Sequence, residues 1–547
     1  MEPLYFYSYM DCTATRITYR DTGAFSGLMT DYLSAAPALA PFYRYPVNWE
    51  GFREALEKRK LIKTDRLELV AHLKEQYDGI DLTPELSQNI DALAQENSFT
   101  VVTAHQPNLF TGPLYFIYKI LHAIKLSEAA AQQFPGYRFV PVYYMGNEDA
   151  DLDELGHFHL QGEKIEWKTP QTGAVGWMKI DDELIKLINR IEGELGVRTN
   201  GQELVNALRR FYKKGSTIQS ATLQLVNYLF GRYGLVVIIA DSRRMKQQMI
   251  PIFEKELFEN SAGNWVEPTA EKLATAGYKV QAHPREINLF YLADGIRNRI
   301  EKVANGYIVH QTDKEFSTEE MRAELHSFPE RFSPNVILRG IFQETILPNI
   351  AFIGGGGETA YWLQLKELFD HYQVPFPMLV VRNSFLLMNE RQYLQTTGMG
   401  LTATDLFEDE EKILQQLALR NNPDLLNLDE NEKIAVANYD AMMQQAGRID
   451  QTLVAHVEAL KTRAIHQIQE LEKKMIRAGK RKLSDERRQI NSLKKQLFPK
   501  AGLQERTESF MGFFADNGQQ WIDSIYRHSL TLEQQFVVLT CQASNTR

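Results

Sequence analysis

The chain of 547 residues is long enough for two to four domains of about 150 residues each. Its apolar fraction of 44% and charged fraction of 24% are typical of a soluble globular protein. The net charge of −9 argues against general nucleic-acid binding. The charge is uneven, because residues 461–500 contain 13 Lys and Arg against 4 Asp and Glu, so one basic helical segment belongs to an otherwise acidic protein.

Only two cysteines are present, Cys12 and Cys541, and they lie near opposite ends of the chain. We therefore expect neither a disulfide framework nor a thiolate zinc site, which suits a reducing cytoplasm. The first residues lack the basic start and apolar run of a signal peptide. The longest strongly apolar run, Leu235 to Ala240, is too short to cross a membrane. These features predict a cytoplasmic protein with no membrane partner.

Residues 1–95 are predicted to form mostly helices and connections at the N-terminal side of a core. From Phe99 an apolar, β-branched run predicts a buried strand, which breaks into a turn at Pro107. From Leu114 to Ile124, apolar residues three or four apart predict a helix. A strand, a turn and a helix are the first half of a βαβ unit, in which the turn lies at the carboxyl end of the strand. We expect this turn to belong to the functional site.

The turn supplies a set of candidate ligand-binding residues: Thr103, His105, Gln106, Asn108, Thr111 and Gly112. It contains neither GxGxxG nor GxxxxGK[ST], so neither a dinucleotide fingerprint nor a Walker loop is predicted. The alternative is a tight turn in which His105 and Asn108 only satisfy backbone groups.

A second apolar run, Phe139 to Met145, predicts the next parallel strand, and polar residues follow its end. They are Asn147, Glu148, Asp149, Asp151 and Asp153. Open α/β sheets bind ligands at such strand ends, where carboxylates hold an ammonium, act as a base or coordinate Mg²⁺. The neighbouring His157 and His159 make a metal site conceivable, but we assign no metal ligand. The alternative is that Asp151 or Asp153 caps the following helix.

Two insertions are predicted to interrupt the core. Residues 160–230 contain turns followed by helices, and residues 260–330 contain short strands, expected at 278–281, 289–292 and 307–309. Between the insertions, Leu235 to Ala240 is the clearest buried strand of the chain, and it ends at Asp241.

Four consecutive glycines, Gly354 to Gly357, follow an apolar strand and precede a predicted helix that begins with Glu358 and Tyr361. Glycines permit close backbone approach to a ligand and can form an anion-binding concavity. We expect Gly355, Gly356 and Gly357 to offer N–H groups to a carboxylate or phosphate, with Glu358 and Tyr361 beside the ligand. The alternative is a flexible hinge. The last predicted core strand is Phe376 to Val381.

From about residue 426 the pattern becomes helical. Apolar residues from Ile449 to Met475 repeat with an 11-residue period, a turn is expected at 478–480, and heptad-like spacing resumes from Leu483 to Leu497. This predicts an antiparallel coiled-coil domain over residues 426–505, after which residues 506–547 return to the core. Because the apolar seam is long for so thin an element, we expect a partner chain to cover part of it.

Four blocks of the sequence resemble the bacillithiol biosynthesis cysteine-adding enzymes: His105 to Tyr115, Gly146 to Asp149, the glycine run with Glu358, and Leu503 to Arg506. Their order and spacing cover nearly the whole chain. The resemblance implies an α/β fold, with a Rossmann-like parallel-sheet core in residues 96–425, connecting-peptide insertions and an α-helical coiled-coil domain. The chain departs from many of these enzymes in having His105-Gln106-Pro107-Asn108 where they carry Gln-Gln-Pro-Gly, and it has no KMSKS-type loop.

The resemblance also implies an activity, the last step of bacillithiol synthesis, in which L-cysteine is joined to the amino group of glucosaminyl-malate. Amide formation needs an activated carboxylate, an unprotonated amine and a stabilised oxyanion. We expect Asn147 and Glu148 to bind or deprotonate the amine, and His105 to donate a hydrogen bond to the carboxylate oxygen. The cofactor is unknown, although ATP or another activating cosubstrate is compatible with this chemistry. The family is further associated with an adenine nucleotide site outside the core cleft, for which Ser384, Phe385 and Leu386 are candidates.

Two other functions remain open. One is a nucleotidyl or glycosyl transferase that uses the same cleft, and the other is a coiled-coil scaffold with a degenerate core. Polar residues at several strand ends argue against the scaffold, because a core kept only for stability has no use for them there.

Overall fold

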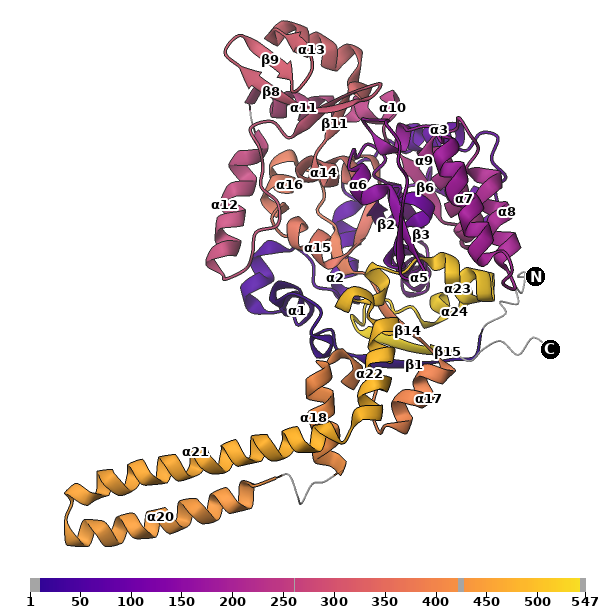
Figure 1. Ribbon diagram of the computed structural model, residues 1–547. Coiled ribbons are helices and arrows are strands. Elements are labelled where there is room, and N and C mark those ends of the chain that lie inside the picture. Colours follow the sequence, from indigo (N-terminus) through magenta and orange to yellow (C-terminus); the bar gives the residue numbers. More distant parts are fainter. Residues whose placement is uncertain (1–9, 260, 422–426, 542–547) are drawn as a thin grey trace. The chain divides into compact units, whose positions relative to one another are not determined.

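The computed structural model describes residues 10–259, 261–421 and 427–541 (Figure 1). The chain forms two compact units. The core unit comprises the described parts of residues 1–20, 24–387 and 502–547, and the helical unit comprises residues 21–23 and the described parts of 388–501.

A five-stranded parallel sheet forms the centre of the core unit. In spatial order its strands are β13 (Met378–Val381), β12 (Asn349–Gly354), β2 (Ser98–His105), β3 (Arg138–Met145) and β6 (Val236–Ile239). All four neighbouring pairs are parallel. The chain starts at the central strand β2, extends to β3 and β6, and returns on the other side to β12 and β13. This order is Rossmann-like, so the predicted α/β fold class is confirmed.

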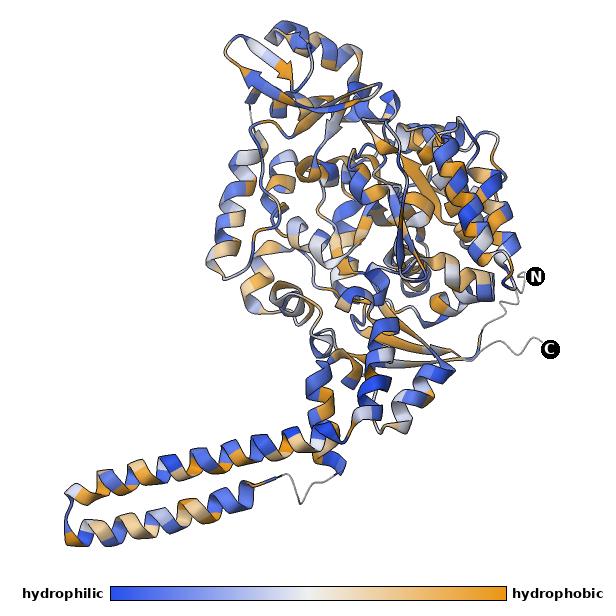
Figure 2. Ribbon diagram, viewed as in Figure 1, coloured by the Kyte–Doolittle hydropathy of each residue, from blue (hydrophilic) through white to orange (hydrophobic). Residues whose placement is uncertain are grey.

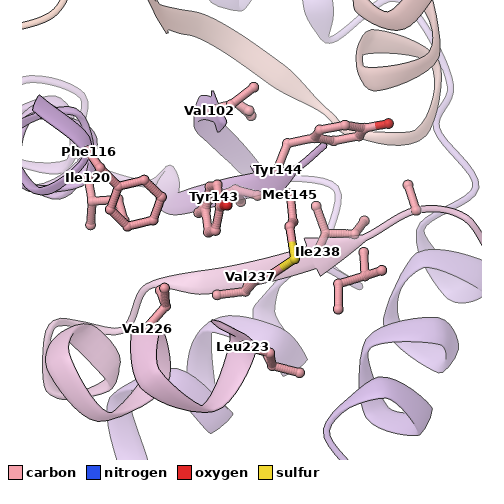
Figure 3. Close-up of a cluster of buried hydrophobic side chains, with 14 of the residues drawn as sticks. Val102, Phe116, Ile120, Tyr143, Tyr144, Met145, Leu223, Val226, Val237 and Ile238 are labelled. Atoms are coloured by element: carbon pink, nitrogen blue, oxygen red, sulfur yellow. The ribbon is translucent and has the colours of Figure 1, made fainter. Parts of the chain in front are cut away.

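The core strands form where the sequence has short apolar runs, because a parallel sheet is covered on both faces and its strands are buried throughout. Helix α5 (Tyr115–Gln133) packs on β2 and β3, and α9 (Ile218–Phe230) packs on β6. Figure 3 shows part of this core, where Phe116 and Ile120 of α5 and Leu223 and Val226 of α9 surround buried side chains of β3 and β6.

The N-terminal part of the core unit contains four helices. They are α1 (Gly27–Leu33), α2 (Trp49–Arg59), α3 (Arg66–Gln76) and α4 (Pro84–Ala92). It also contains one strand that the sequence did not predict, β1 (Cys12–Ile17). A three-stranded sheet joins β1, β15 (Phe536–Cys541) and β14 (Ser384–Asn389), in the order β1-β15-β14.

Cys12 and Cys541 lie opposite each other in the antiparallel pair of β1 and β15, and their sulfurs form a disulfide. The expectation that these cysteines remain unpaired was therefore wrong. The sequence separation of 529 residues conceals the pairing, because it is created by two terminal strands that meet in one sheet.

The chain between β3 and β6 contains a hairpin and helices. They are α6 (Leu152–Leu155), β4 (His157–Leu160), β5 (Glu163–Glu166), the 3-10 turn η4 (Val175–Trp177), α7 (Asp182–Leu195), α8 (Gly201–Phe211) and α9. In Figure 1, α7, α8 and α9 lie side by side. This segment matches the first predicted insertion in position and composition.

The chain between β6 and β12 forms a second, antiparallel sheet with helices. Its elements are α10 (Arg243–Lys246), α11 (Ile250–Glu259), α12 (Ser261–Thr275), β7 (Leu289–Ala293), β8 (Ile296–Val303), β9 (Gly306–Val309), β10 (Glu315–Phe316), α13 (Thr318–Ser327), β11 (Phe332–Pro334) and α14 (Val336–Ile346). The strand expected at 278–281 is absent from this described segment. There the side chain of Gln364 binds the backbone instead, accepting from the N–H groups of Gln281 and Ala282 and donating to the Ala282 carbonyl.

After β12 the core continues with α15 (Gly356–Trp362), α16 (Lys366–Tyr372) and β13, and it is completed after the helical unit by α23 (Phe510–Asn517), α24 (Gln519–His528) and β15. The helical unit consists of α17 (Glu390–Gly398), α18 (Glu410–Asn421), α20 (Asp429–Ile449), α21 (Thr452–Arg481) and α22 (Ser484–Leu497). It begins near residue 388 rather than near 426, so α17 and α18 belong with the coiled coil.

The long hairpin of the helical unit is formed by α20 and α21 (Figure 1). The turn expected at 478–480 was misplaced, since these residues lie within α21 and the chain reverses at Asp450. The carboxylate of Asp450 accepts from the backbone N–H and the hydroxyl of Thr452, which fixes the reversal. Helix α22 instead packs on α18, and a small apolar cluster there contains Ile490 of α22 and Leu483, the residue before it.

Candidate functional site

A cavity of about 530 Å³ lies in the core unit at the carboxyl ends of the parallel strands. We call it the strand-end cavity. Its lining includes residues that follow all five core strands: His105 and Gln106 after β2, Gly146 to Asp149 after β3, Asp241 after β6, Gly355 to Glu358 after β12, and Arg382 after β13. The sequence prediction that these strand ends form one site is therefore consistent with their position in the fold.

The charges around the cavity are unevenly distributed. Four carboxylates lie on the segments that follow β3 and β6: Glu148, Asp149, Glu154 and Asp241. Cationic side chains that line the cavity come mainly from other elements: Lys119, Arg297, Arg339, Arg382 and Arg506. A cavity with separated acidic and basic groups suits ligands that carry both an ammonium and a carboxylate.

Three ion pairs with buried partners surround the cavity. Lys246 contacts Glu148, Lys119 Nζ lies 2.6 Å from Glu358 Oε2, and Arg382 Nη2 lies 2.7 Å from Glu505 Oε1. These contacts fix the orientation of the three carboxylates. Within the described chain, Arg339 and Arg506 form no ion pair, and neither does Asp241, so their charges remain available to a ligand.

His105 lies at the end of β2, where its ring packs against the rings of Tyr115 and Phe116, with centroids 5.3 and 5.6 Å away. Its Nε2 is buried without a hydrogen-bond partner. Burial lowers the pKa of His105 well below its ordinary value, and the positive charges of Lys119 and Arg382 lower it further. The imidazole is thus neutral at physiological pH, when one ring nitrogen is a donor and the other an acceptor.

The environment of Glu148 and Asn147 changes the roles expected for them. Glu148 accepts from Lys246 Nζ and, at 2.8 Å, from Ser333 Oγ. Both oxygens of this carboxylate are therefore already bound to protein donors, which leaves them less available to a substrate amine. Asn147 is 2% exposed and donates through Nδ2 to Gln219 Oε1 and Asp241 Oδ2, both at 2.6 Å. Both residues line the cavity, but most of their polar atoms are bound to protein groups.

Four of the candidates from the first turn lie outside the cavity lining: Thr103, Asn108, Thr111 and Gly112. Thr103 Oγ1 donates to the Ile353 carbonyl at 2.9 Å, across the sheet. Phe110 and Thr111 have φ of 50° and 70°, and a Cβ on Gly112 (φ 65°) would lie 2.8 Å from Asn108 Cβ. These residues shape a strained turn, whereas His105 and Gln106 face the cavity.

Of the polar residues that follow β3, some line the cavity and others do not. Asp149 lines the cavity, accepts from Gln106 Nε2 at 3.2 Å and lies 3.7 Å from Arg297 Nη1. Asp151 lies outside the lining and caps α6 by accepting from the Glu154 N–H at 3.0 Å. The capping alternative therefore describes Asp151.

The glycine run borders the cavity, followed by Glu358 and Tyr361. The Gly355 N–H, which was expected to face a ligand, donates to Glu358 Oε2 at 2.7 Å. A Cβ on Gly356 would meet Met29 at 3.5 Å, whereas a Cβ on Gly357 would have no atom within 4 Å. Neither glycine has a positive φ, so the backbone conformation does not require glycine and the missing side chains leave space in the cavity.

The three nucleotide-site candidates Ser384, Phe385 and Leu386 are buried in β14 and are not part of the cavity lining. Glu505 accepts hydrogen bonds from Ser384 Oγ and from the Phe385 N–H, both at 3.2 Å. Through these contacts Ser384 and Phe385 join β14 to the segment that follows the helical unit.

Sequence reasoning did not assign several cavity residues: Lys119, Asp241, Arg297, Arg339, Arg382 and Arg506. Asp241 and Arg382 carry the same signal as the residues that were assigned, namely a polar side chain directly after a buried strand. Arg506 lies in a block that carries the family resemblance. Lys119 and Arg339 lie within helices and have no such local signal, and Arg339 Nη2 donates to Tyr361 Oη at 2.9 Å.

In the residues that the structure describes, no group of three or more His, Cys, Asp or Glu side chains is arranged to hold a metal ion. Across the same ranges, every helix is too short or too polar to pass through a lipid bilayer.

Comparison with known proteins relates both parts of the chain to one family. Residues 10–383 match the model of the "Bacillithiol biosynthesis BshC, N-terminal Rossmann-like domain", and residues 385–541 match that of the "C-terminal coiled-coil domain". A protein of Flavobacterium johnsoniae is 37% identical over 96% of this chain and 99% of its own length. One of Christiangramia forsetii is 37% identical over 96% of this chain and 98% of its own. Both carry the name "Putative cysteine ligase BshC".

Proposed function

The chain belongs to the bacillithiol biosynthesis BshC family, and we propose that it is a cysteine ligase that joins L-cysteine to the amino group of glucosaminyl-malate. The observation that carries this proposal is the strand-end cavity, in which unpaired cations and an unpaired carboxylate meet. Both substrates carry an ammonium group and at least one carboxylate. The volume of the strand-end cavity, about 530 Å³, is within the range of small-molecule sites.

Arg339 and Arg506 are the proposed carboxylate-binding residues. A guanidinium forms paired hydrogen bonds to a carboxylate, and the absence of an ion pair leaves both groups free to do so. Arg339 is held in place by Tyr361 Oη and by Gln343 Oε1, the latter at 3.1 Å. A partly buried guanidinium without a counterion is costly to a fold, which supports a ligand as its partner.

His105 is the proposed donor to the oxyanion that develops when the amine attacks the activated carboxyl group. A neutral imidazole suits this role, because its one N–H group donates a hydrogen bond while the ring carries no second, acidic proton. The glycine run lies beside the same space and admits the ligand at close range. Activation of the carboxylate needs a cosubstrate, for which ATP is chemically suited.

Homodimerisation through the helical unit is the second part of the proposal. Helices α20 and α21 have no buried residue along their described lengths. Several apolar side chains are exposed on them: Ile434, Met442, Ile449, Leu453, Leu460 and Leu471. Figure 2 shows these helices with hydrophobic and hydrophilic residues interspersed. A second copy of the chain would cover the apolar stripe.

The two alternatives have less support. A scaffold with a degenerate core would not retain Arg339 beside an open cavity, because Arg339 has hydrogen-bond partners but forms no ion pair in the described chain, and a partly buried charge without a counterion destabilises a fold. For a nucleotidyl or glycosyl transferase, no contact within the described residues favours that chemistry over amide formation.

The proposal is tested in a strain from which the gene is deleted. We expect glucosaminyl-malate to accumulate and bacillithiol to be absent, and the wild-type gene to restore the thiol. Arg339→Met should fail to restore it, because the carboxylate loses its partner. The matched control is Arg391→Met, since Arg391 is exposed and lies outside the cavity. Unchanged thiol levels in the deletion strain would refute the ligase.

A further inference from the structure

Asp241 lies two residues after the end of β6 and lines the strand-end cavity. Its Oδ2 accepts two hydrogen bonds, from Trp177 Nε1 at 2.5 Å and from Asn147 Nδ2 at 2.6 Å. Within the described chain, Oδ1 has no hydrogen-bond partner and Asp241 forms no ion pair. One carboxylate oxygen is therefore fixed and the other remains available in the cavity.

The turn η4 is built to place Trp177 against Asp241. The N–H of Val175 donates to the Asp149 carbonyl at 2.7 Å, and that of Gly176 donates to the Asn147 carbonyl at 3.0 Å. A Cβ on Gly176 would lie 2.5 Å from that carbonyl oxygen, so only glycine permits the approach. The second N–H of the Asn147 amide donates to Gln219 Oε1, which orients the amide toward Asp241.

The other carboxylates of the cavity are already neutralised or lie at its exposed rim. Glu148 and Glu358 each contact a buried lysine, and Asp149 accepts from Gln106 and lies near Arg297. Glu154 is exposed. Asp241 thus combines a fixed orientation with a full, unbalanced negative charge, and such a group favours a cationic ligand.

We propose that Asp241 binds the primary ammonium group of a substrate, with Trp177 and Asn147 as positioning residues. This inference rests on the proposed ligase function, because both L-cysteine and the amino sugar carry a primary ammonium. An N⁺–H group donates to Oδ1, while the two protein donors on Oδ2 keep the carboxylate from rotating. Asp241 thereby takes the amine-binding role that the sequence indicated for Glu148.

The test measures binding by calorimetry for two pairs of ligands that differ only in the amine. One pair is L-cysteine and 3-mercaptopropionate, and the other is glucosaminyl-malate and glucosyl-malate. In Asp241→Asn the amide oxygen still accepts from Trp177 and Asn147, but the charge is lost. We expect this variant to bind one ammonium ligand with an affinity about tenfold or more below that of the wild type. Its affinity for the amine-free analogue should be unchanged. The pair that responds identifies which ammonium Asp241 binds.

Two further variants separate this effect from a structural one. Asp313→Asn makes the same charge change at an exposed residue outside the cavity, and this variant should bind every ligand as the wild type does. Trp177→Phe keeps the charge of Asp241 but removes one orienting donor. It should therefore lower the affinity for the same ammonium ligand by a smaller factor. Its selectivity for the amine provides the readout should Asp241→Asn fail to fold.

Equal weakening of an ammonium ligand and its amine-free analogue would overturn the proposal, because it would mean that Asp241 only supports the fold. Unchanged binding of both ammonium ligands to Asp241→Asn would overturn the ammonium site while leaving the ligase function intact. Failure of the wild-type protein to bind either ammonium ligand would contradict the ligase function, and with it this site.

Discussion

At the scale of single residues, the buried histidine His122 links three segments of the core unit. Its Nε2 lies 2.6 Å from the Thr531 carbonyl, and its Nδ1 accepts from the Asn383 N–H at 3.1 Å. Nε2 must then carry the proton and Nδ1 must be unprotonated, so both contacts require the neutral ring. Burial lowers the pKa of His122 from 6.5 to about 4.

We therefore expect His122 to make the protein sensitive to acid. The unfolded chain binds the proton near pH 6.5 and the folded chain only near pH 4, so stability falls as the pH drops through this window. Between pH 7 and pH 5 the loss from this one residue is about 2 kcal/mol. Denaturant titration of His122→Gln should show a pH dependence smaller by about this amount. If the free energy of unfolding of His122→Gln depends on pH as strongly as that of the wild type, His122 is not protonated on unfolding.

Glu148 and Lys246 allow a second prediction at this scale. Lys246 is fully buried, and besides Glu148 it contacts the Phe332 carbonyl. Glu148→Gln leaves a buried ammonium without its counterion, which costs about 3–5 kcal/mol. Thermal unfolding should show this loss, so reduced activity in this variant would not by itself identify a base.

The matched control is the double variant Glu148→Gln with Lys246→Met, in which the uncompensated charge is also removed. We expect it to recover most of the lost stability. If Glu148→Gln melts at the wild-type temperature, the ion pair contributes little to stability. Glu148 then again becomes a candidate for a residue that binds or deprotonates the substrate amine.

At the scale of elements, the core strands were predictable and the identity of the cavity residues was less so. Apolar runs bounded by turns determine the strands of a buried parallel sheet, and these runs include all five core strands. The segments expected to form the cleft, which carry His105, Asn147 and the glycine run, all border the strand-end cavity. Which side chain of each turn faces that cavity depends on tertiary packing, as the outward Asp151 and the buried Thr111 illustrate.

Two cationic residues of the cavity also could not be identified from the local sequence. Lys119 and Arg339 lie on α5 and α14, and only the packing of these helices on the sheet brings them to the cavity. The strand expected at 278–281 failed for a comparable reason, because a distant glutamine occupies the backbone groups that a strand would have paired. Contacts between elements that are remote in sequence leave no periodic signal.

The glycine run yields a prediction for an element. A Cβ at Gly357 would have no protein atom within 4 Å and would enter the cavity. Gly357→Ala should therefore weaken substrate binding while raising stability by about 0.5–1 kcal/mol, the usual gain from replacing glycine in a helix. Calorimetry and thermal unfolding measure the two effects.

Gly193→Ala in α7 is the matched control, since a Cβ there also has no atom within 4 Å and lies outside the cavity lining. We expect it to raise stability similarly without changing substrate affinity. Wild-type affinity in Gly357→Ala would show that the ligand does not approach this part of the glycine run.

At the scale of the whole molecule, the helical unit is inserted into the chain of the core unit. The segment after it supplies Arg506 to the strand-end cavity and Glu505 to Arg382. Its start near residue 388 was not visible in the sequence, because α17 and α18 lack the long apolar repeat of the coiled coil. The Cys12–Cys541 disulfide was equally hidden, since no local pattern indicates that the two terminal strands pair.

Dimerisation is the prediction that belongs to this scale. Leu460 and Leu471 lie on α21 and are 38% and 52% exposed, although α21 has the length and apolar spacing of a helix that packs against a partner. Placing a carboxylate at either site would bury a charge in a dimer interface, so Leu460→Asp with Leu471→Asp should yield monomers in light scattering. The control is Leu61→Asp with Leu67→Asp, which changes two leucines of the core unit that are 78% and 75% exposed and should keep the dimer mass. A dimer mass in the α21 variant would place the interface elsewhere, and a monomeric wild-type protein would mean that the exposed stripe serves another purpose.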